Sequence, residues 1–202
     1  MTNSNKQQKR NRRTIVLMLL MSVLPIVAAI LFYINPQWIG SYKNYGTLIT
    51  PPLQLQKNDL TAFGDFSQQH FSELDDHWVF IHIMPEQVNS CHERCAKALY
   101  HSHQLWIMLN QNLMRLRRVA VFPSVDVATK LKSVIGDDYL LYAVGSQSLF
   151  NQLSTVLPTP IDAGTIVLRD PLGNIMLWYS ADFDPYKAKK DLSRLFRTSR
   201  IG

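Results

Sequence analysis

The feature that most constrains this chain is an uncharged apolar segment near its N-terminus. From Ile15 to Ile34 there are twenty consecutive residues without a charge, mostly Leu, Ile, Val, Met and Ala. As a helix that rises about 1.5 Å per residue, this segment is roughly 30 Å long, which is the hydrocarbon thickness of a bilayer. We therefore predict a transmembrane helix over residues 14–34, in which Pro25 produces a kink rather than a break.

The flanks of this segment indicate its orientation. Residues 1–13 form a polar tail that holds five of the 21 basic residues and no acid: Lys6, Lys9, Arg10, Arg12 and Arg13. Such a cluster stays cytoplasmic, so we predict a single-pass protein of a bacterial inner membrane with its C-terminal domain in the periplasm. A cleaved signal peptide is the alternative, but the apolar run is too long and no clear small-x-small cleavage site follows it.

The charge distribution argues against a nucleic-acid partner. The formal net charge is +6, but without the tail 16 basic residues face 15 acidic ones. The body of the protein is therefore nearly neutral and lacks the basic patch that DNA or RNA binding requires.

Strand and helix patterns alternate in the rest of the chain. Residues 35–59 are expected to be an extracytoplasmic connector with one short strand candidate at 47–49, and residues 60–202 the domain proper. The predicted strands are 77–83, 119–122 and 139–144, followed by a hairpin of 164–168 and 175–179. The predicted helices are 91–116, 125–134 and 147–157, with a last helix that begins after an Asp184 N-cap and Pro185. This order predicts an α/β domain, a thioredoxin-like sandwich with a parallel sheet and an antiparallel edge.

Cys91 and Cys95 are the candidate reactive residues of the chain. They form a C-x-x-x-C motif where a predicted strand leads into a helix. The partial positive charge at a helix N-terminus stabilises a thiolate. Two residues four apart within a helix have Cβ atoms about 5–6 Å apart, which is too far for a disulfide. Cys91 must therefore lie in the loop or first turn if the pair is to close, whereas Cu(I) could be held by two thiolates without closure.

His92, inside the motif, is the third candidate metal ligand. We interpret His82 as a hydrogen-bonded histidine near the sheet end, and His101 and His103 as ordinary surface or hydrogen-bonded histidines. For the cysteine pair, a structural disulfide without turnover is the alternative, because a C-x-x-x-C motif alone does not exclude it.

The strand with its apolar run, the C-x-x-x-C motif at the following helix start, and the Asp170-Pro171-Leu172-Gly173 hairpin with a C-terminal helix resemble the Sco/SenC proteins. The resemblance covers roughly residues 60–200 plus the anchor. It implies a membrane-anchored thioredoxin fold that delivers copper to cytochrome c oxidase or reduces its copper-binding cysteines. By that resemblance Cys91 and Cys95 are the copper-binding or redox thiols, and the partner is a respiratory oxidase subunit or its assembly factors.

The chain departs from the family pattern at two points. The family's copper-binding histidine precedes the hairpin strand, but residues 161–165 contain none, and His92 and Ala96 follow the cysteines where the family usually has prolines. These departures shift weight toward thiol–disulfide exchange or a divergent assembly factor. Two hypotheses follow: a Sco/SenC-like accessory factor that uses the pair for Cu(I) or disulfide chemistry, and a non-catalytic thioredoxin-like docking module with a structural disulfide. A thiol–disulfide oxidoreductase with unrelated targets is the third.

Overall fold

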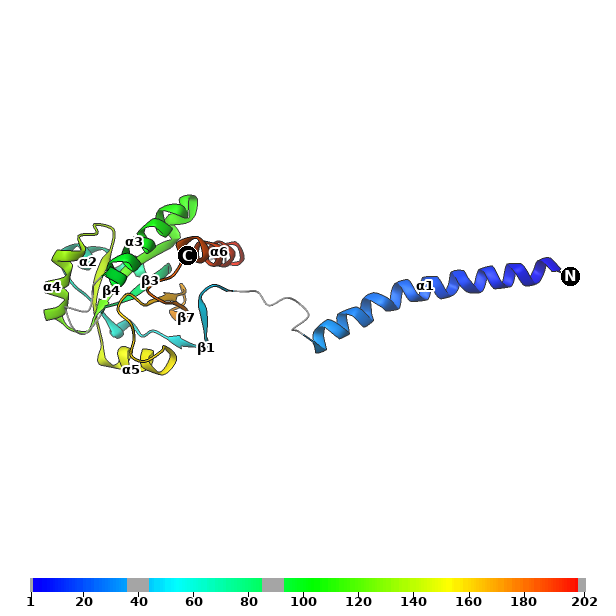
Figure 1. Ribbon diagram of the computed structural model, residues 1–202, viewed down its shortest axis with the longest axis horizontal. Coiled ribbons are helices and arrows are strands. Elements are labelled where there is room, and N and C mark those ends of the chain that lie inside the picture. The colour runs from blue at the N-terminus through cyan, green and yellow to red at the C-terminus, as the bar shows by residue number, and fades with distance from the viewer. Residues whose placement is uncertain (1, 36–43, 85–92, 200–202) are drawn as a thin grey trace. The chain divides into compact units, whose positions relative to one another are not determined.

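The computed structural model of the chain describes residues 2–35, 44–84 and 93–199. The chain divides into two compact units, Met1–Lys43 and Asn44–Gly202. In the first unit a single helix, α1 (Thr2–Ile34), includes both the basic tail and the apolar segment (Figure 1). By length and composition, its part from Asn11 to Ile34 is able to cross a membrane. The helix predicted for the apolar segment is confirmed.

The second unit contains a mixed sheet whose described strands have the order β1-β7-β6-β3-β4-β5-β2. Strands β3, β4 and β5 are parallel, whereas β6 and β7 form an antiparallel hairpin beside β3. The strands are β1 (Thr47–Gln54), β2 (Leu60–Ala62), β3 (Trp78–Ile83), β4 (Leu116–Phe122), β5 (Leu141–Gly145), β6 (Ile166–Arg169) and β7 (Asn174–Tyr179). Because β3 is the middle strand of the sheet, the residues that follow it lie near the centre of the edge formed by the strand ends.

Helices cover both faces of this sheet. They are α2 (Asp65–His70), α3 (Glu93–Met108), α4 (Val125–Ile135), α5 (Gln147–Val156) and α6 (Pro185–Thr198), with 3-10 turns η2 (Lys57–Asp59), η3 (Phe71–Leu74) and η5 (Asn110–Arg115). Side chains alternate along β3: Trp78 and Phe80 pack against α3 and α6, while Val79 and Ile81 pack against α5. The expected α/β sandwich is therefore confirmed, with its core split between the two faces of the sheet.

Two local predictions hold residue by residue. Asp184 caps α6, since its Oδ1 accepts hydrogen bonds from the backbone N–H groups of Tyr186 and Lys187, at 2.8 and 3.4 Å. The hairpin turn closes with the Gly173 N–H donating to the Asp170 carbonyl at 3.1 Å. Both signals are local in sequence, which is why they could be recognised without tertiary information.

Two boundaries differ from the prediction. The helix expected over 91–116 ends at Met108, because Asn110 adopts a left-handed backbone with φ of 49° and η5 follows. The expected connector over 35–59 includes β1, which has eight residues where the strand candidate had three and which pairs with β7 at the sheet edge. Pro51 and Pro52 are compatible with this strand because an edge strand need not donate every ladder hydrogen bond. The compact unit accordingly begins at Asn44 rather than near Leu60.

One buried carboxylate attaches the start of this unit to α6. Asp191 is 3% exposed, and its Oδ2 accepts hydrogen bonds from the backbone N–H groups of Tyr45 and Gly46 at 2.9 and 3.0 Å. The Tyr179 hydroxyl donates to the same oxygen at 3.2 Å. Burial, and then the neighbouring Asp191 charge, raise the pKa of Tyr179 far above its usual value, so its hydroxyl remains a donor. Three donors, two from the segment before β1 and one from β7, thus depend on one side chain.

We expect Asp191→Ala to lower the free energy of unfolding by roughly 2–4 kcal/mol, because it leaves buried donors without an acceptor. Urea denaturation of the full chain in detergent micelles, followed by tryptophan fluorescence, measures the change. Asp138→Ala, at an exposed position, is the matched control and should change stability by less than about 0.5 kcal/mol. Equal stabilities of the two variants would contradict this role of Asp191.

Candidate functional site

The candidate site lies at the end of β3 and the start of α3. The structure describes α3 from Glu93 onward, and Cys95 lies in this first described turn. Cys95 is 1% exposed. The buried positions of α3 (Cys95, Ala98, Leu99, Ser102 and Leu105) recur at helical spacing and turn this face toward the sheet. The helix thus presents the cysteine inward rather than to solvent.

Met84, directly after β3, lies beside the cysteine. The Sγ of Cys95 and the Sδ of Met84 are 4.0 Å apart, and Met84 is 2% exposed. The Met84 backbone N–H donates to the Val121 carbonyl at 2.9 Å, so its backbone continues the ladder between β3 and β4. Around the two sulfur atoms, Leu99 and Phe122 complete an apolar cluster. Sequence reasoning did not identify Met84, although the alternation along β3 would have placed it on the face that packs against α3.

Gly164 allows α3 to approach the hairpin closely. A Cβ at this position would lie 3.0 Å from the Cα of Cys95 and 3.1 Å from the Cβ of Ala98. Its φ of +87° is also a conformation that residues with side chains rarely adopt. The position before β6 therefore has to be glycine for the backbone of Cys95 to pack where it does.

Arg94 links the first turn of α3 to two loops at the surface. Its Nη2 is 2.8 Å from Oδ2 of Asp182 and 3.5 Å from Oδ2 of Asp162. The side chains of Arg94, Asp162 and Asp182 are 57%, 59% and 49% exposed. Exposed ion pairs contribute about 0–1 kcal/mol, so these contacts orient the turn without fixing it strongly.

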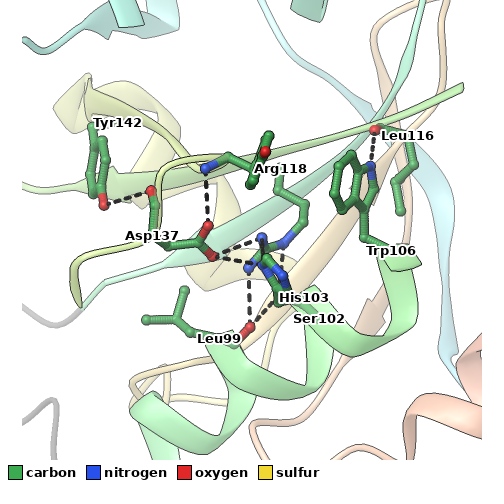
Figure 2. Close-up of polar contacts among 9 residues, drawn as sticks. Leu99, Ser102, His103, Trp106, Leu116, Arg118, Asp137 and Tyr142 are labelled. Carbon is green, nitrogen blue, oxygen red and sulfur yellow. Dashed lines mark hydrogen bonds and ion pairs between the residues drawn. The ribbon is translucent and has the colours of Figure 1, made fainter. Parts of the chain in front are cut away.

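One turn further along α3, a buried arginine holds the helix to the sheet (Figure 2). Arg118 on β4 is 2% exposed; it donates to the Ser102 hydroxyl at 3.1 Å and to the Leu99 carbonyl at 3.1 Å. Its Nη1 lies 2.8 Å from Oδ2 of Asp137, and His103 lies beside this ion pair, as Figure 2 shows. The arginine thus connects β4, α3 and the turn before β5.

The Arg118–Asp137 pair sets the ionisation of both groups. Burial raises the pKa of Asp137, but the charge and hydrogen bond of Arg118 outweigh it, so this pKa lies below its usual value. Burial lowers the pKa of Arg118, and Asp137 opposes that effect. We therefore treat the pair as ionised at neutral pH.

His82 differs from the sequence interpretation. It is fully buried on β3, and neither ring nitrogen has a hydrogen-bond partner within the described part of the chain. Burial, and then the nearby Arg118 charge, hold the pKa of His82 well below its usual value, so the imidazole is neutral. The expected hydrogen bond is absent because the flanking side chains on this face, Phe80 and Met84, are apolar.

The other predicted histidines are placed as expected. Nδ1 of His101 is 3.1 Å from the Phe183 carbonyl, and Nδ1 of His103 is 3.4 Å from Asp137. Cys91 and His92, predicted as a thiol and a metal ligand, lie outside the described residues. Among the residues that the structure describes, no three His, Cys, Asp or Glu side chains gather closely enough to hold a metal ion.

The family of the chain is decided by its C-terminal domain. Residues 78–199, more than half of the chain, match the model of a family described as a transmembrane-like, thioredoxin-like, C-terminal domain. The chain belongs to this family. The matched region begins at β3 and ends at the last described residue after α6. It therefore contains the candidate site and the contacts of Arg118 with α3 and Asp137.

Solved structures of Sco proteins are similar to this family member. Apo Sco1 from Thermus thermophilus matches with a TM-score of 0.51 and 16% identity, covering 77% of this chain and 99% of that chain. A SCO1/SenC family lipoprotein from Bacillus anthracis matches with 0.49 and 16%, covering 73% and 99%, and copper-bound yeast Sco1 with 0.49 and 14%, covering 63% and 80%. No curated protein matches the sequence. The likeness to the Thermus protein confirms the thioredoxin-like fold expected from the Sco/SenC resemblance.

We expect Gly164→Ala to be more destabilising than a glycine change that meets no atoms. Gly136, at the end of α4, also has positive φ (+56°), but a Cβ there has nothing within 4 Å. Gly136→Ala should cost about 1 kcal/mol, the conformational cost alone, and Gly164→Ala about 1–3 kcal/mol more. Urea denaturation of both variants measures the difference. If the two variants lose the same stability, Gly164 does not support the packing of α3.

We expect the stabilising effect of Asp137 to disappear in acid. Because its pKa is lowered on folding, its contribution is present above the unfolded value, about 3.9, and is lost as the pH falls through the folded value. Asp137→Asn should cost roughly 2–4 kcal/mol at pH 7, since it leaves buried Arg118 without its counter-charge. The difference from the wild type should shrink below about pH 4. Denaturation experiments between pH 3 and 7 on Asp137→Asn and the wild type measure this difference.

Proposed function

We propose that the protein is a membrane-anchored, Sco/SenC-like accessory factor for assembly of a respiratory cytochrome c oxidase. The observation that carries this proposal is the position of Cys95. It lies in the first turn of the helix after the central strand of a thioredoxin-like sheet, the place where such a fold can stabilise a thiolate. The resemblance of the C-x-x-x-C motif and the Asp170 hairpin to the Sco/SenC proteins supports the same role.

The anchor supports a site of action at a bacterial inner membrane. The five basic residues before the apolar segment favour a cytoplasmic N-terminus. The domain with the two cysteines would then face the periplasm, where thiols of a partner are oxidised and where disulfides form. The proposed binding surface of this protein is therefore a membrane and not a nucleic acid.

Copper is the cargo that the cysteine pair would carry. Two soft thiolates, Cys91 and Cys95, would hold Cu(I) in the reduced protein, and His92 next to them would supply a nitrogen. The chain's contribution is to present soft ligands and to exclude water from them.

The same pair would carry out thiol–disulfide exchange. Because Cys95 is buried, we assign the first attack to Cys91. Its thiolate would attack one sulfur of a partner disulfide, forming a mixed disulfide and releasing the other partner sulfur as a thiolate. The Cys95 thiolate would then attack the Cys91 sulfur, forming a Cys91–Cys95 disulfide and releasing the second partner thiolate. Two electrons pass to the partner, and its two thiolates take up the two protons that the pair has lost.

A non-catalytic docking module is the second candidate function. It is favoured by the apolar surroundings of Cys95, which include Leu99, Ala120 and Phe122. A disulfide there would add stability by restricting the unfolded chain, typically by about 2–4 kcal/mol. Binding to a membrane complex would then be the only activity.

Anaerobic titration of Cu(I) into the reduced full-length protein in detergent micelles, against a competing chelator, tests the proposal. We expect one tight equivalent, and we expect the Cys91→Ser/Cys95→Ser variant to lose at least 100-fold in affinity. Met176→Leu, on β7, is a control for unspecific binding by thioethers and should bind as the wild type does.

A parallel assay distinguishes the remaining roles. The reduced protein is mixed with a disulfide-bonded peptide, and the peptide thiols are counted with time. Absence of thiol-dependent Cu(I) binding would rule out copper handling. If the peptide also remains oxidised, exchange is ruled out too and the docking module is the function that remains.

A further inference from the structure

A cavity lies between the sheet and the segment that joins β1 to β2. These two strands are at opposite edges of the sheet, so residues 55–59, between them, pass from one edge to the other. On one side the Leu55 N–H donates to the Gly173 carbonyl at 2.9 Å, and on the other the Asp59 carbonyl accepts from the Ser146 N–H at 2.8 Å. The cavity beneath this crossing segment has a volume of about 190 Å³.

The Asp59 side chain holds the crossing segment in place. It is 6% exposed, and its Oδ2 accepts a hydrogen bond from the Gln56 N–H at 2.8 Å. Its Oδ1 accepts from the hydroxyl of Ser146, directly after β5, also at 2.8 Å. Both carboxylate oxygens of a buried residue thus fix the segment, so the cavity is already formed in the free protein.

Most of the cavity wall is apolar. Val79 and Ile81 from β3, Leu60 from β2, and Phe71 and Leu74 from η3 line it. Binding sites for small molecules usually combine such a wall with a few polar groups that orient the ligand. The cavity is smaller than the usual range of about 300–1,000 Å³, so a ligand here has to be small.

The guanidinium of Arg169, at the end of β6, also belongs to this wall. Its Nη1 donates to the Leu74 carbonyl. Its Nε is buried without a hydrogen-bond partner among the described residues, and its Nη2, which is not buried, makes no hydrogen bond with them either. None of the ion pairs in this part of the chain includes Arg169. Because an arginine stays protonated at neutral pH, the cavity wall carries a positive charge without a direct counter-ion.

Nearby acidic side chains compensate this charge only at longer range. Burial lowers the pKa of Arg169, and the charges of Asp75 and then Asp170 oppose that effect. Asp75 and Lys57 also line the cavity, with Oδ2 and Nζ 3.9 Å apart and side chains 53% and 89% exposed. Two basic side chains and one acidic side chain therefore line the cavity, which favours an anionic ligand.

We infer that this cavity binds a small aliphatic monocarboxylate, with its carboxylate on Arg169 and its chain against Leu60, Val79 and Ile81. A carboxylate gives the guanidinium charge-assisted hydrogen bonds, which are roughly twice as strong as neutral ones. An aliphatic chain gains affinity with each methylene that the apolar wall withdraws from water. An inorganic anion would use only the charge of the cavity, and a neutral alcohol only its apolar wall.

The cavity is separate from the cysteine region. Val79 and Ile81 lie on the face of β3 that packs against α5, whereas α3, which carries Cys95, packs on the opposite face. Binding of the carboxylate therefore does not depend on the proposed function.

Isothermal titration calorimetry of the full chain in detergent micelles tests the inference without any substitution. The probes are sodium butyrate, sodium acetate and butan-1-ol, each corrected for its heat with empty micelles. We expect butyrate to bind about 10-fold more tightly than acetate, which lacks two methylenes. Butan-1-ol, which has the chain without the charge, should also bind about 10-fold more weakly than butyrate. Absence of butyrate binding, or equal affinities of butyrate and either of the other probes, would overturn the inference.

Two substitutions test the role of Arg169 in opposite directions. Arg169→Gln should bind butyrate at least 10-fold more weakly, whereas Arg197→Gln, the same change at an exposed position of α6, should bind as the wild type does. Asp75→Asn removes a negative charge beside the cavity and should bind butyrate about 2- to 5-fold more tightly. Because misfolding cannot produce tighter binding, this variant keeps the test decisive even if Arg169→Gln is unstable. Wild-type affinity in Arg169→Gln, or no gain of affinity in Asp75→Asn, would contradict a carboxylate site at Arg169.

Discussion

The architecture around the site depends on the burial of one positive charge. A guanidinium withdrawn from water is destabilising unless hydrogen bonds and a counter-charge surround it. Arg118 obtains its acceptors from Leu99 and Ser102 on α3 and its counter-charge from Asp137 before β5. Satisfying this side chain therefore requires β4, α3 and β5 to be in their native places together.

The contacts of Arg118 also affect the position of Cys95, because both act on the same face of α3. Leu99, whose carbonyl accepts from Arg118, lies one turn after Cys95 on the same buried face of α3. An inward or outward shift of α3 would stretch the contacts of Arg118 and change the distance between Cys95 and Met84 together. Arg118 thus helps to position the part of α3 that carries Cys95.

The sequence predicted best the features whose cause is local. The apolar segment of α1, the Asp184–Pro185 start of α6 and the hairpin turn at Asp170 each follow from a few adjacent residues. The remaining features depend on tertiary contacts. The prolines of β1 are compatible with a strand only because β7 makes it an edge, and no periodicity revealed that Asn110 would end α3 early.

The candidate site divides in the same way. The C-x-x-x-C motif is visible as a spacing, but Met84, whose sulfur atom lies 4.0 Å from that of Cys95, is an ordinary residue of an apolar run. Its importance arises from the packing of a strand end on a helix start. Gly164 is similar, since a lone glycine before a strand carries no sign that a helix backbone will lie against it.

Burial of Cys95 and exchange of a cargo set opposing demands on the first turn of α3. Cys95 is only 1% exposed, so a partner protein has no direct access to its sulfur atom. The contacts that hold the turn differ in strength: the Arg94 ion pairs are more than half exposed at the arginine and are weakened by salt, whereas Arg118 is buried one turn further along. The contacts of the first described turn are therefore weaker than those that hold α3 to the sheet from Leu99 onward. Met84, whose backbone N–H donates to the Val121 carbonyl at 2.9 Å, belongs to the sheet and not to this turn.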